Sequence, residues 1–410
     1  MPAPDLNALR HALPADTERR ADHYLIDGVA PAAAFQPDDR YGVATLLRVA
    51  STDGLTVAPQ GGRTATGFGR PLEAYDLALD LRGLRRVVEY VPDDLTITVE
   101  AGMTLAQVQQ VLGEHGQYLP MDPPPDDSVT IGGLLATAKT GAWRGHLGSP
   151  RDHLLGVEVA LPSGALARSG GRVVKNVTGY DLHRLHTGAL GAFGVIVEAS
   201  FKVAPRPAVA RTLAAPADDL HEATRVARAA WDASIATRAI TLLGSAAAAH
   251  LGLPGRPTVL VELAGTSAAV ERSVAEFQAL SATTRDLDGR VWARLRALHG
   301  DTTAAVARLG VPPSLVADIV ASAEGAGGRA WGHLAAGAVL VHGDLGTDAL
   351  RRLRAAAEER GGFLQLEHAP VALRREFAPA EPGDGDLVRA LRDRFDLKRT
   401  INRGRWGAGL

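Results

Sequence analysis

The hydrophobic pattern of this chain is most regular between residues 193 and 203. Odd positions from Val195 to Val203 are apolar, whereas Glu198, Ser200 and Lys202 between them are polar. Successive side chains of a strand point to opposite faces of a sheet. The alternation therefore predicts a strand with one buried face.

Shorter patterns precede this strand, beginning near residue 34, where a polar N-terminal arm is expected to end. Strands are predicted at residues 54–59, 95–100 and 153–161. A helix is predicted to begin at Thr104, because Gln107 stands three residues later and completes a capping box. Gly116 suits the end of that helix. Strands and helices thus alternate up to residue 203.

A second series of predicted strands and helices follows Pro205-Arg206-Pro207, where the prolines restrict the backbone and indicate a linker. The predicted strands are residues 209–213, 258–264, 338–342 and 363–367, and the predicted helices are residues 221–233, 268–280 and 350–359. A single antiparallel sheet with helices on one face explains this order. From residue 386 a final helix leads into the polar end Asn402-Arg403-Gly404-Arg405.

Composition narrows the function classes. A chain of 410 residues is long enough for two or three domains, and its net charge of −2 offers no basic surface for nucleic acid or anionic lipid. No apolar run is long enough to cross a membrane, and the N-terminus does not resemble a secretory signal. The absence of cysteine excludes disulfides, thiolate metal sites, iron–sulfur clusters and a cysteine-linked flavin in this chain. A cytoplasmic location is expected, with any contact to the inner membrane made through partners.

Three glycine-rich segments carry the candidate chemistry. The first contains Gln60, Gly61, Gly62, Arg63, Thr64 and Gly67, where backbone N–H groups can approach a phosphate. The second contains Pro125, Thr130, Gly132 and Gly133, which lead into a short helix that runs to Gly141 and offers its N-terminus to an anion. The third runs from Gly170 through Gly188 and Gly191 to Gly194. Taken singly, each also fits a tight turn, an ordinary helix cap or a packing loop. Neither a Walker A loop nor a Rossmann fingerprint is present.

In this order the three segments resemble the p-cresol methylhydroxylase-type FAD-binding domain of the vanillyl-alcohol oxidase superfamily. The resemblance covers residues 35–203 and the tail. It implies that the first segment wraps the FAD pyrophosphate and that the second continues this wrapping towards the flavin. It also implies that the third holds the flavin or the adenine by its backbone. The FAD-binding residues it implies are Gln60, Gly61, Gly62, Arg63, Thr64, Gly67, Pro125, Thr130, Gly132, Gly133, Thr140, Gly141, Gly194, Val195 and Ile196.

A narrower resemblance links the chain to the FAD-binding second subunits of bacterial glycolate oxidases. Residues 174–182 (Val-Lys-Asn-Val-Thr-Gly-Tyr-Asp-Leu) and 188–194 (Gly-Ala-Leu-Gly-Ala-Phe-Gly) are similar to the signature of that family, although the tail has Asn-Arg-Gly-Arg where the family has Asn-Pro-Gly-Arg. The family implies a small 2-hydroxy acid substrate, a larger FAD subunit and an iron–sulfur subunit. The first glycine segment contains no histidine, so non-covalent FAD is expected.

Oxidation of a 2-hydroxy acid by a flavin needs a base for the hydroxyl proton and a cation for the carboxylate. His146 and Arg144 follow the second segment and are candidates for these roles, although both also fit a surface loop. Lys175 and Tyr180 are further candidates, while Asp181 is expected to cap the next helix and pair with Lys175.

Two short fragments, His342-Gly343-Asp344 and Glu367-His368, resemble parts of the metal site of related 2-hydroxy-acid dehydrogenases. A second histidine and a Gly-Asn pair are missing, so no metal is expected.

The sequence thus predicts an α+β fold with an arm (1–34), an FAD-binding domain (35–205), a ferredoxin-like antiparallel cap (206–384) and a tail (385–410) that returns to the FAD domain. The leading function is the FAD-binding subunit of a glycolate oxidase-like 2-hydroxy-acid dehydrogenase that passes electrons to a partner. A self-sufficient oxidase or dehydrogenase of the same superfamily, and a non-catalytic FAD-binding assembly subunit, are the alternatives.

Overall fold

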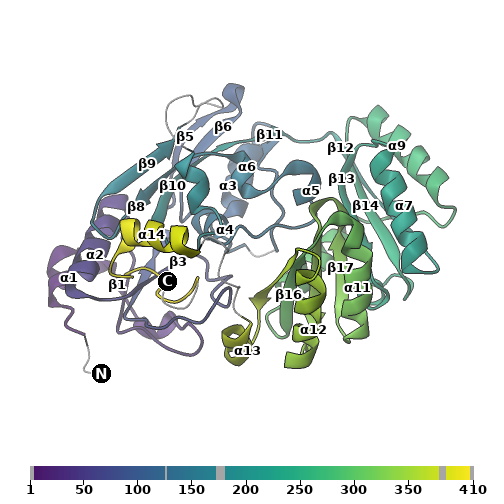
Figure 1. Ribbon diagram of the computed structural model, residues 1–410. Coiled ribbons are helices and arrows are strands. Elements are labelled where there is room, and N and C mark those ends of the chain that lie inside the picture. The colour runs from purple at the N-terminus through teal and green to yellow at the C-terminus, as the bar shows by residue number, and fades with distance from the viewer. Residues whose placement is uncertain (1–3, 125–126, 172–180, 378–384, 407–410) are drawn as a thin grey trace.

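The computed structural model describes residues 4–124, 127–171, 181–377 and 385–406. Helices and strands form two lobes, and the C-terminal helix α14 (Gly385–Asp396) lies on the first lobe, far in sequence from its neighbours there (Figure 1). The arrangement confirms the predicted α+β fold. No helix within these ranges is both long and apolar enough to cross a membrane.

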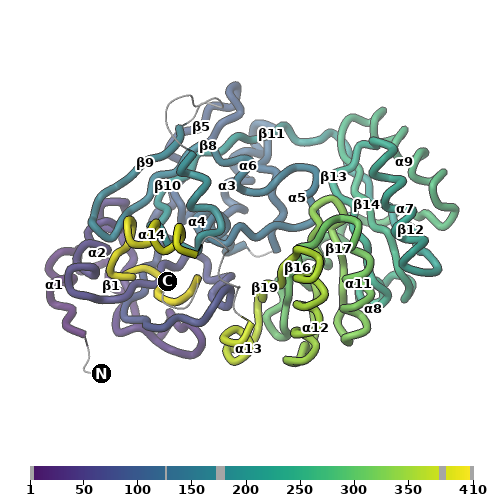
Figure 2. The backbone as a smooth tube through the Cα atoms, in the orientation of Figure 1, coloured from purple at the N-terminus to yellow at the C-terminus, as the bar shows by residue number. Residues whose placement is uncertain are grey.

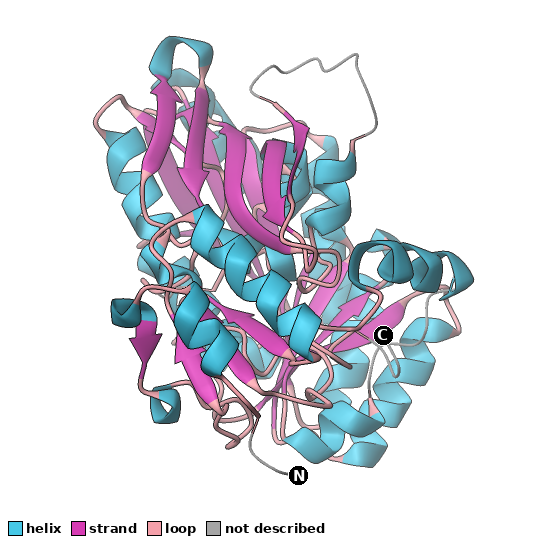
Figure 3. Cartoon of the chain, turned by 90° about the vertical axis from the view of Figure 1, so that its left-hand side faces the viewer, coloured by secondary structure: helices cyan, strands magenta, loops and turns pink. Residues whose placement is uncertain are grey.

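A four-stranded sheet forms the base of the first lobe, in the order β1-β2-β4-β3. Its strands are β1 (Glu18–Arg19), β2 (Ala33–Phe35), β4 (Leu77–Asp80) and β3 (Val57–Gln60). Helix α2 (Arg40–Asp53) is capped at its N-terminus by Asp39, whose carboxylate accepts from the Gly42 N–H at 2.8 Å. The helix lies between this sheet and the next (Figure 3). The tail extends the sheet, since Val57 exchanges backbone hydrogen bonds with Thr400 and Asn402.

The N-terminal residues differ from the predicted polar arm. They contain α1 (Asn7–Ala12), which packs on α2 and buries Leu9 completely. Leu9 and its apolar neighbours Leu6 and Leu13 are spaced three and four residues apart, so they share the helix face that meets the core.

A five-stranded antiparallel sheet completes the first lobe, in the order β5-β6-β10-β8-β9. Its strands are β5 (Val87–Val91), β6 (Thr96–Glu100), β10 (Val195–Lys202), β8 (Leu154–Ala160) and β9 (Leu166–Gly170). Helix α3 (Leu105–Gly113) packs on it and begins with the predicted capping box of Thr104 and Gln107.

Strand β10 shows where the predicted alternation fails. A register shift between Ile196 and Glu198 interrupts its pairing with β8. Val195 and Val197 therefore pack with the core beneath α2, whereas Ala199 and Phe201 pack with the core beneath α3. A bulge inverts the facing of every later residue, and the pattern of residue types alone does not reveal it.

The second lobe is built on one eight-stranded antiparallel sheet, as predicted, in the order β15-β12-β14-β13-β17-β18-β16-β19. Its strands are β12 (Val209–Pro216), β13 (Thr237–Leu243), β14 (Thr258–Gly265), β15 (Arg285–Leu287), β16 (Ala305–Gly310), β17 (Arg329–His333), β18 (Ala338–Gly343) and β19 (Phe363–His368). The first four and the last four strands each show the order 4-1-3-2 of a ferredoxin-like unit. The sheet is thus two such units joined along β13 and β17.

Helices cover both faces of this sheet, not one as expected. The outer face carries α7 (Leu220–Asp232), α9 (Ser267–Leu280), α11 (Val316–Gly325) and α12 (Thr347–Glu358). Figure 2 shows α7 and α9 at the right-hand end of the second lobe and α11 and α12 along its lower front. The other face carries α8 (Ser245–His250) and α10 (Arg290–Gly300), together with Ala142 and Trp143 of the first lobe.

Polar contacts as well as apolar packing join the lobes. The Trp143 indole N–H donates to Glu262 at 2.6 Å, and Glu262 also pairs with Arg238, whose guanidinium lies over the Trp143 ring. At the opposite edge, buried Arg374 pairs with Asp27. The junction therefore holds strand β19 of the second lobe beside the loops of the first.

Candidate functional site

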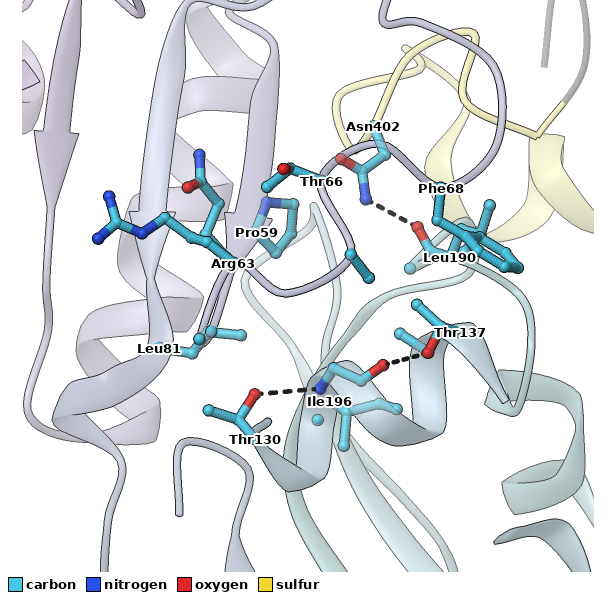
Figure 4. Close-up of a pocket in the computed structure, with 18 of the residues that line it drawn as sticks. Pro59, Arg63, Thr66, Phe68, Leu81, Thr130, Thr137, Leu190, Ile196 and Asn402 are labelled. Carbon is cyan, nitrogen blue, oxygen red and sulfur yellow. Dashed lines mark hydrogen bonds between the residues drawn. The ribbon is translucent and has the colours of Figure 1, made fainter. Parts of the chain in front are cut away.

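The three glycine segments meet around one pocket in the first lobe (Figure 4). They arrive from the end of β3, from the N-terminus of α4 (Ile131–Thr137) and from the start of β10. The lining comprises Ile26, Pro59, Gln60, Gly61, Gly62, Arg63, Thr64, Ala65, Thr66, Phe68, Leu81, Thr130, Gly132, Gly133, Ala136, Thr137, Leu190, Gly191, Gly194, Val195, Ile196, Asn402 and Arg405.

The first two glycine segments lie in close contact. A Cβ on Gly62 would lie 1.6 Å from the Ser128 carbonyl oxygen, and one on Gly61 would lie 2.1 Å from the Thr130 hydroxyl. Thr130 in turn caps α4, where its hydroxyl accepts from the Gly133 N–H at 3.3 Å. Only glycine permits this approach, which sets the two loops as adjoining walls.

One wall of the pocket holds a buried acceptor that has no partner. The Gln60 amide donates to the Tyr75 hydroxyl at 2.5 Å, and that hydroxyl donates to the Tyr24 carbonyl at 2.7 Å. Burial raises the pKa of Tyr75, which keeps the hydroxyl protonated. The Gln60 Oε1 atom is buried without a hydrogen bond, as expected of a group that awaits a donor from a ligand.

A buried cation stands at the other end of the lining. Arg405 is 6% exposed and donates to the carbonyls of Thr66 and Phe68 at 2.6 and 3.0 Å. Burial, helped by the charge of Arg374, lowers its pKa to about 10, so the guanidinium stays charged at neutral pH. Across the ranges described, no carboxylate forms an ion pair with it. An anionic ligand would supply the missing charge.

Three residues of the pocket lining have a left-handed backbone conformation. Arg63, Leu190 and Asn402 have φ values of +61°, +50° and +47°, a region that side chains other than asparagine rarely adopt. The Asn402 amide donates to the Leu190 carbonyl at 2.7 Å and fixes the tail against the third glycine segment (Figure 4). The Arg63 side chain points away from the pocket, towards the His23 carbonyl and the Tyr24 ring.

Most of the predicted FAD-binding residues line the pocket. They are Gln60, Gly61, Gly62, Arg63, Thr64, Thr130, Gly132, Gly133, Gly194, Val195 and Ile196. Gly67 instead packs against the His368 ring, and the Gly141 N–H donates to the buried carboxylate of Asp122. Thr140 also lies outside the lining, because α4 ends at Thr137 and not near Gly141 as predicted. Pro125 falls outside the described residues.

The sequence did not identify the apolar residues of the lining, and it did not place individual tail residues in the pocket. Ile26, Phe68 and Leu81 carry no motif that distinguishes them from core residues. Gly191, Asn402 and Arg405 lie in motifs that the sequence singled out, yet their own positions in the pocket were not predicted. The tail motif was the signal that could have identified Asn402 and Arg405.

The predicted catalytic residues Arg144 and His146 lie together on α5 (Arg144–Leu147), outside the pocket lining. This turn packs against β13, and Gly145 meets Ala335 of the second lobe. Both ring nitrogens of His146 are buried and form no hydrogen bond with the residues that the structure describes, and burial lowers the pKa of His146. Burial, followed by repulsion from Arg308, also lowers the pKa of Arg144.

The remaining candidates are Lys175, Tyr180, Asp181 and the two fragments that resemble a metal site. Lys175 and Tyr180 fall outside the described residues. Asp181 precedes a short 3₁₀ helix but makes no capping bond, and its carboxylate lies 3.5 Å from Arg184. His342 pairs with Asp301 at 2.8 Å, away from Glu367. Within the described parts of the chain, no three side chains of His, Asp or Glu are placed to hold a metal ion.

Comparison with known proteins agrees with this geometry. Residues 31–170 match the family described as FAD binding domain. Glycolate oxidase subunit GlcE of Escherichia coli is 39% identical over 42% of this chain and 50% of its own length. Glycolate oxidase subunit GlcD of Bacillus subtilis is 27% identical over 92% of this chain and 88% of its own length. The match thus spans half of the first relative and most of the second.

A solved structure extends the likeness to the whole fold. The crystal structure of p-cresol methylhydroxylase with substrate bound superposes with a TM-score of 0.78, at 16% identity, over 98% of this chain and 96% of that one. The matches to relatives confirm the FAD-binding domain and the predicted likeness to glycolate oxidase subunits, and the superposition confirms the fold class.

Proposed function

Since the chain contains an FAD-binding domain in a p-cresol methylhydroxylase-type fold and is related to glycolate oxidase subunits, we propose that it is the FAD-binding subunit of a 2-hydroxy-acid dehydrogenase. The pocket carries this proposal. It joins two backbone-lined glycine loops, the buried Gln60 acceptor and the buried Arg405 cation, which find no donor and no carboxylate, respectively, among the described residues. An FAD molecule offers the pyrophosphate charge and the hydroxyl and ring N–H donors that these groups lack.

We propose the following division of work among the residues. Residues 35–205 form the FAD domain, with the 206–384 cap above it and the 385–410 tail closing it. Backbone N–H groups of the first two glycine loops bind the pyrophosphate, assisted by the N-terminus of α4. The first loop has no histidine, so FAD is held without a covalent bond.

Bound FAD would accept a hydride from C2 of the substrate, which becomes a 2-oxo acid as its hydroxyl proton passes to a base. The electrons would then leave to a partner subunit. A partner is implied because the relatives in Escherichia coli and Bacillus subtilis are subunits of glycolate oxidase. An iron–sulfur centre would have to lie on such a partner because this chain has no cysteine.

An absorbance spectrum of the purified chain, before and after anaerobic glycolate, tests the proposal. We expect a flavin band near ~450 nm that glycolate bleaches. A band that persists would show that the chain holds FAD without oxidising glycolate alone, which favours the assembly role. No band after addition of FAD would refute the proposal.

A further inference from the structure

Beside the glycine pocket lies a second cavity, in which Lys139 is the one charged side chain among the described lining residues. The two cavities share Thr64, Ala65, Gly133 and Thr137 as walls. The second cavity also reaches Gly300 at the end of α10, so it opens towards the other lobe. A ligand there would contact both the occupant of the glycine pocket and Lys139.

Lys139 is held in place across the junction of the lobes. Its ammonium lies 3.6 Å from Glu367 at the end of β19 and 5.6 Å from the centre of the Phe68 ring. The side chain of Lys139 is 13% exposed and that of Glu367 is 3% exposed. Lys139 directly follows Ala138, whose left-handed conformation ends α4 and turns the chain towards the second lobe.

The charges around Glu367 do not balance. Its carboxylate accepts from His299 at 2.7 Å and lies 3.0 Å from the Arg308 Nε, as well as near Lys139. Burial would raise the pKa of Glu367, but His299, Lys139 and Arg308 hold it below its usual range, so it is ionised. Among the described side chains in contact with it, one carboxylate thus faces two basic side chains, Arg308 and Lys139, and Lys139 forms the longest of these contacts and borders the cavity.

We propose that Lys139 binds the carboxylate of a small 2-hydroxy acid in this second cavity, with Glu367 as the residue that positions it. The inference rests on the proposed function, which places FAD in the adjoining glycine pocket. It adds a substrate contact that the glycine motifs do not contain. A carboxylate at Lys139 neutralises the surplus charge and forms a charge-assisted hydrogen bond with the ammonium.

Oxalate, which cannot be oxidised by hydride loss, is the probe. The FAD-loaded protein is titrated with oxalate, and binding is read from the change in flavin absorbance. We expect Lys139→Met to weaken oxalate binding by about tenfold or more, as removal of a charged hydrogen bond does, while flavin content stays unchanged. Lys139→Arg should restore part of the affinity, and Lys202→Met, at an exposed lysine on β10, should change nothing.

The native protein gives a second test that does not depend on any variant folding. Oxamide has the shape of oxalate without its charge, and we expect it not to bind at concentrations that saturate with oxalate. Equal binding of oxamide and oxalate, unchanged oxalate affinity in Lys139→Met, or no oxalate binding by the flavin-loaded protein would each overturn the inference. Failure of the proposed function is distinct, because it appears as a protein that takes up no flavin.

Discussion

Replacement of Gly62 by alanine tests the idea that close contact of two loops creates the FAD site. The added Cβ would lie 1.6 Å from the Ser128 carbonyl oxygen, whereas real contacts of this kind are at least 3.0 Å long. The loops must therefore separate by roughly 1.4 Å, which carries the first loop's N–H groups away from a phosphate held by the second. Loss of one hydrogen bond to a charged group costs ~1.5–3 kcal/mol, equivalent to ~10–150-fold in Kd.

The assay is a titration of the flavin-free protein with FAD, followed by flavin fluorescence. We expect Gly62→Ala to weaken FAD binding at least tenfold while the far-UV circular dichroism spectrum is unchanged. Gly255→Ala is the matched control, because it lies in an exposed loop of the second lobe and its Cβ would meet only ordinary contact at 3.7 Å. Native-like FAD affinity in Gly62→Ala would refute the reasoning, since the loops would then tolerate separation.

Two further predictions concern buried carboxylates. Glu367→Gln leaves Lys139 and Arg308 without their counter-charge, so the free energy of unfolding in urea should fall by ~3–5 kcal/mol. The control variant Glu271→Gln, at an exposed site, should leave the free energy of unfolding unchanged. A loss below ~1 kcal/mol in Glu367→Gln would contradict the buried network. Burial raises the pKa of Asp122 to about 7, against partial opposition from the N–H of Trp143. Between pH ~4 and ~7 the folded state then holds a proton on Asp122 that the unfolded state has lost. The free energy of unfolding should therefore fall as the pH rises through this window, by up to ~4 kcal/mol. In Asp122→Asn this fall should be smaller. Equal pH slopes for this variant and the native protein over that window would show that Asp122 titrates normally, with Asp94→Asn as the exposed control.

Local signals in the sequence predicted the elements that depend on near neighbours. The capping box at Thr104 and Gln107 is complete within four residues, and the structure contains it. The glycine loops were recognised by their own residue types, although Gly61 and Gly62 meet Thr130 and Ser128 of the second segment, whereas Gly133 meets Thr130 of its own segment. Periodicity also placed three of the outer helices of the second lobe to within three residues.

Contacts between distant segments could not be read in this way. The partner of Lys139 is 228 positions away at Glu367, and Asn402 meets Leu190 across 212 positions. Strands β13, β16 and β17 lack a period of two because both faces of the sheet are covered, so buried residues occupy consecutive positions along each strand. The doubling of the ferredoxin-like unit stayed hidden for this reason.

The position of the tail links cofactor binding to folding of the whole first lobe. Arg405 donates to the Thr66 and Phe68 carbonyls of the first glycine loop, and Asn402 holds the loop at Leu190. Three parts of the pocket wall, separated by more than a hundred residues, therefore depend on one another. The unfolded chain has no such wall, so FAD adds its binding free energy to the stability of the folded state. By the same linkage, a change that detaches the tail weakens FAD binding even where it leaves both glycine loops intact.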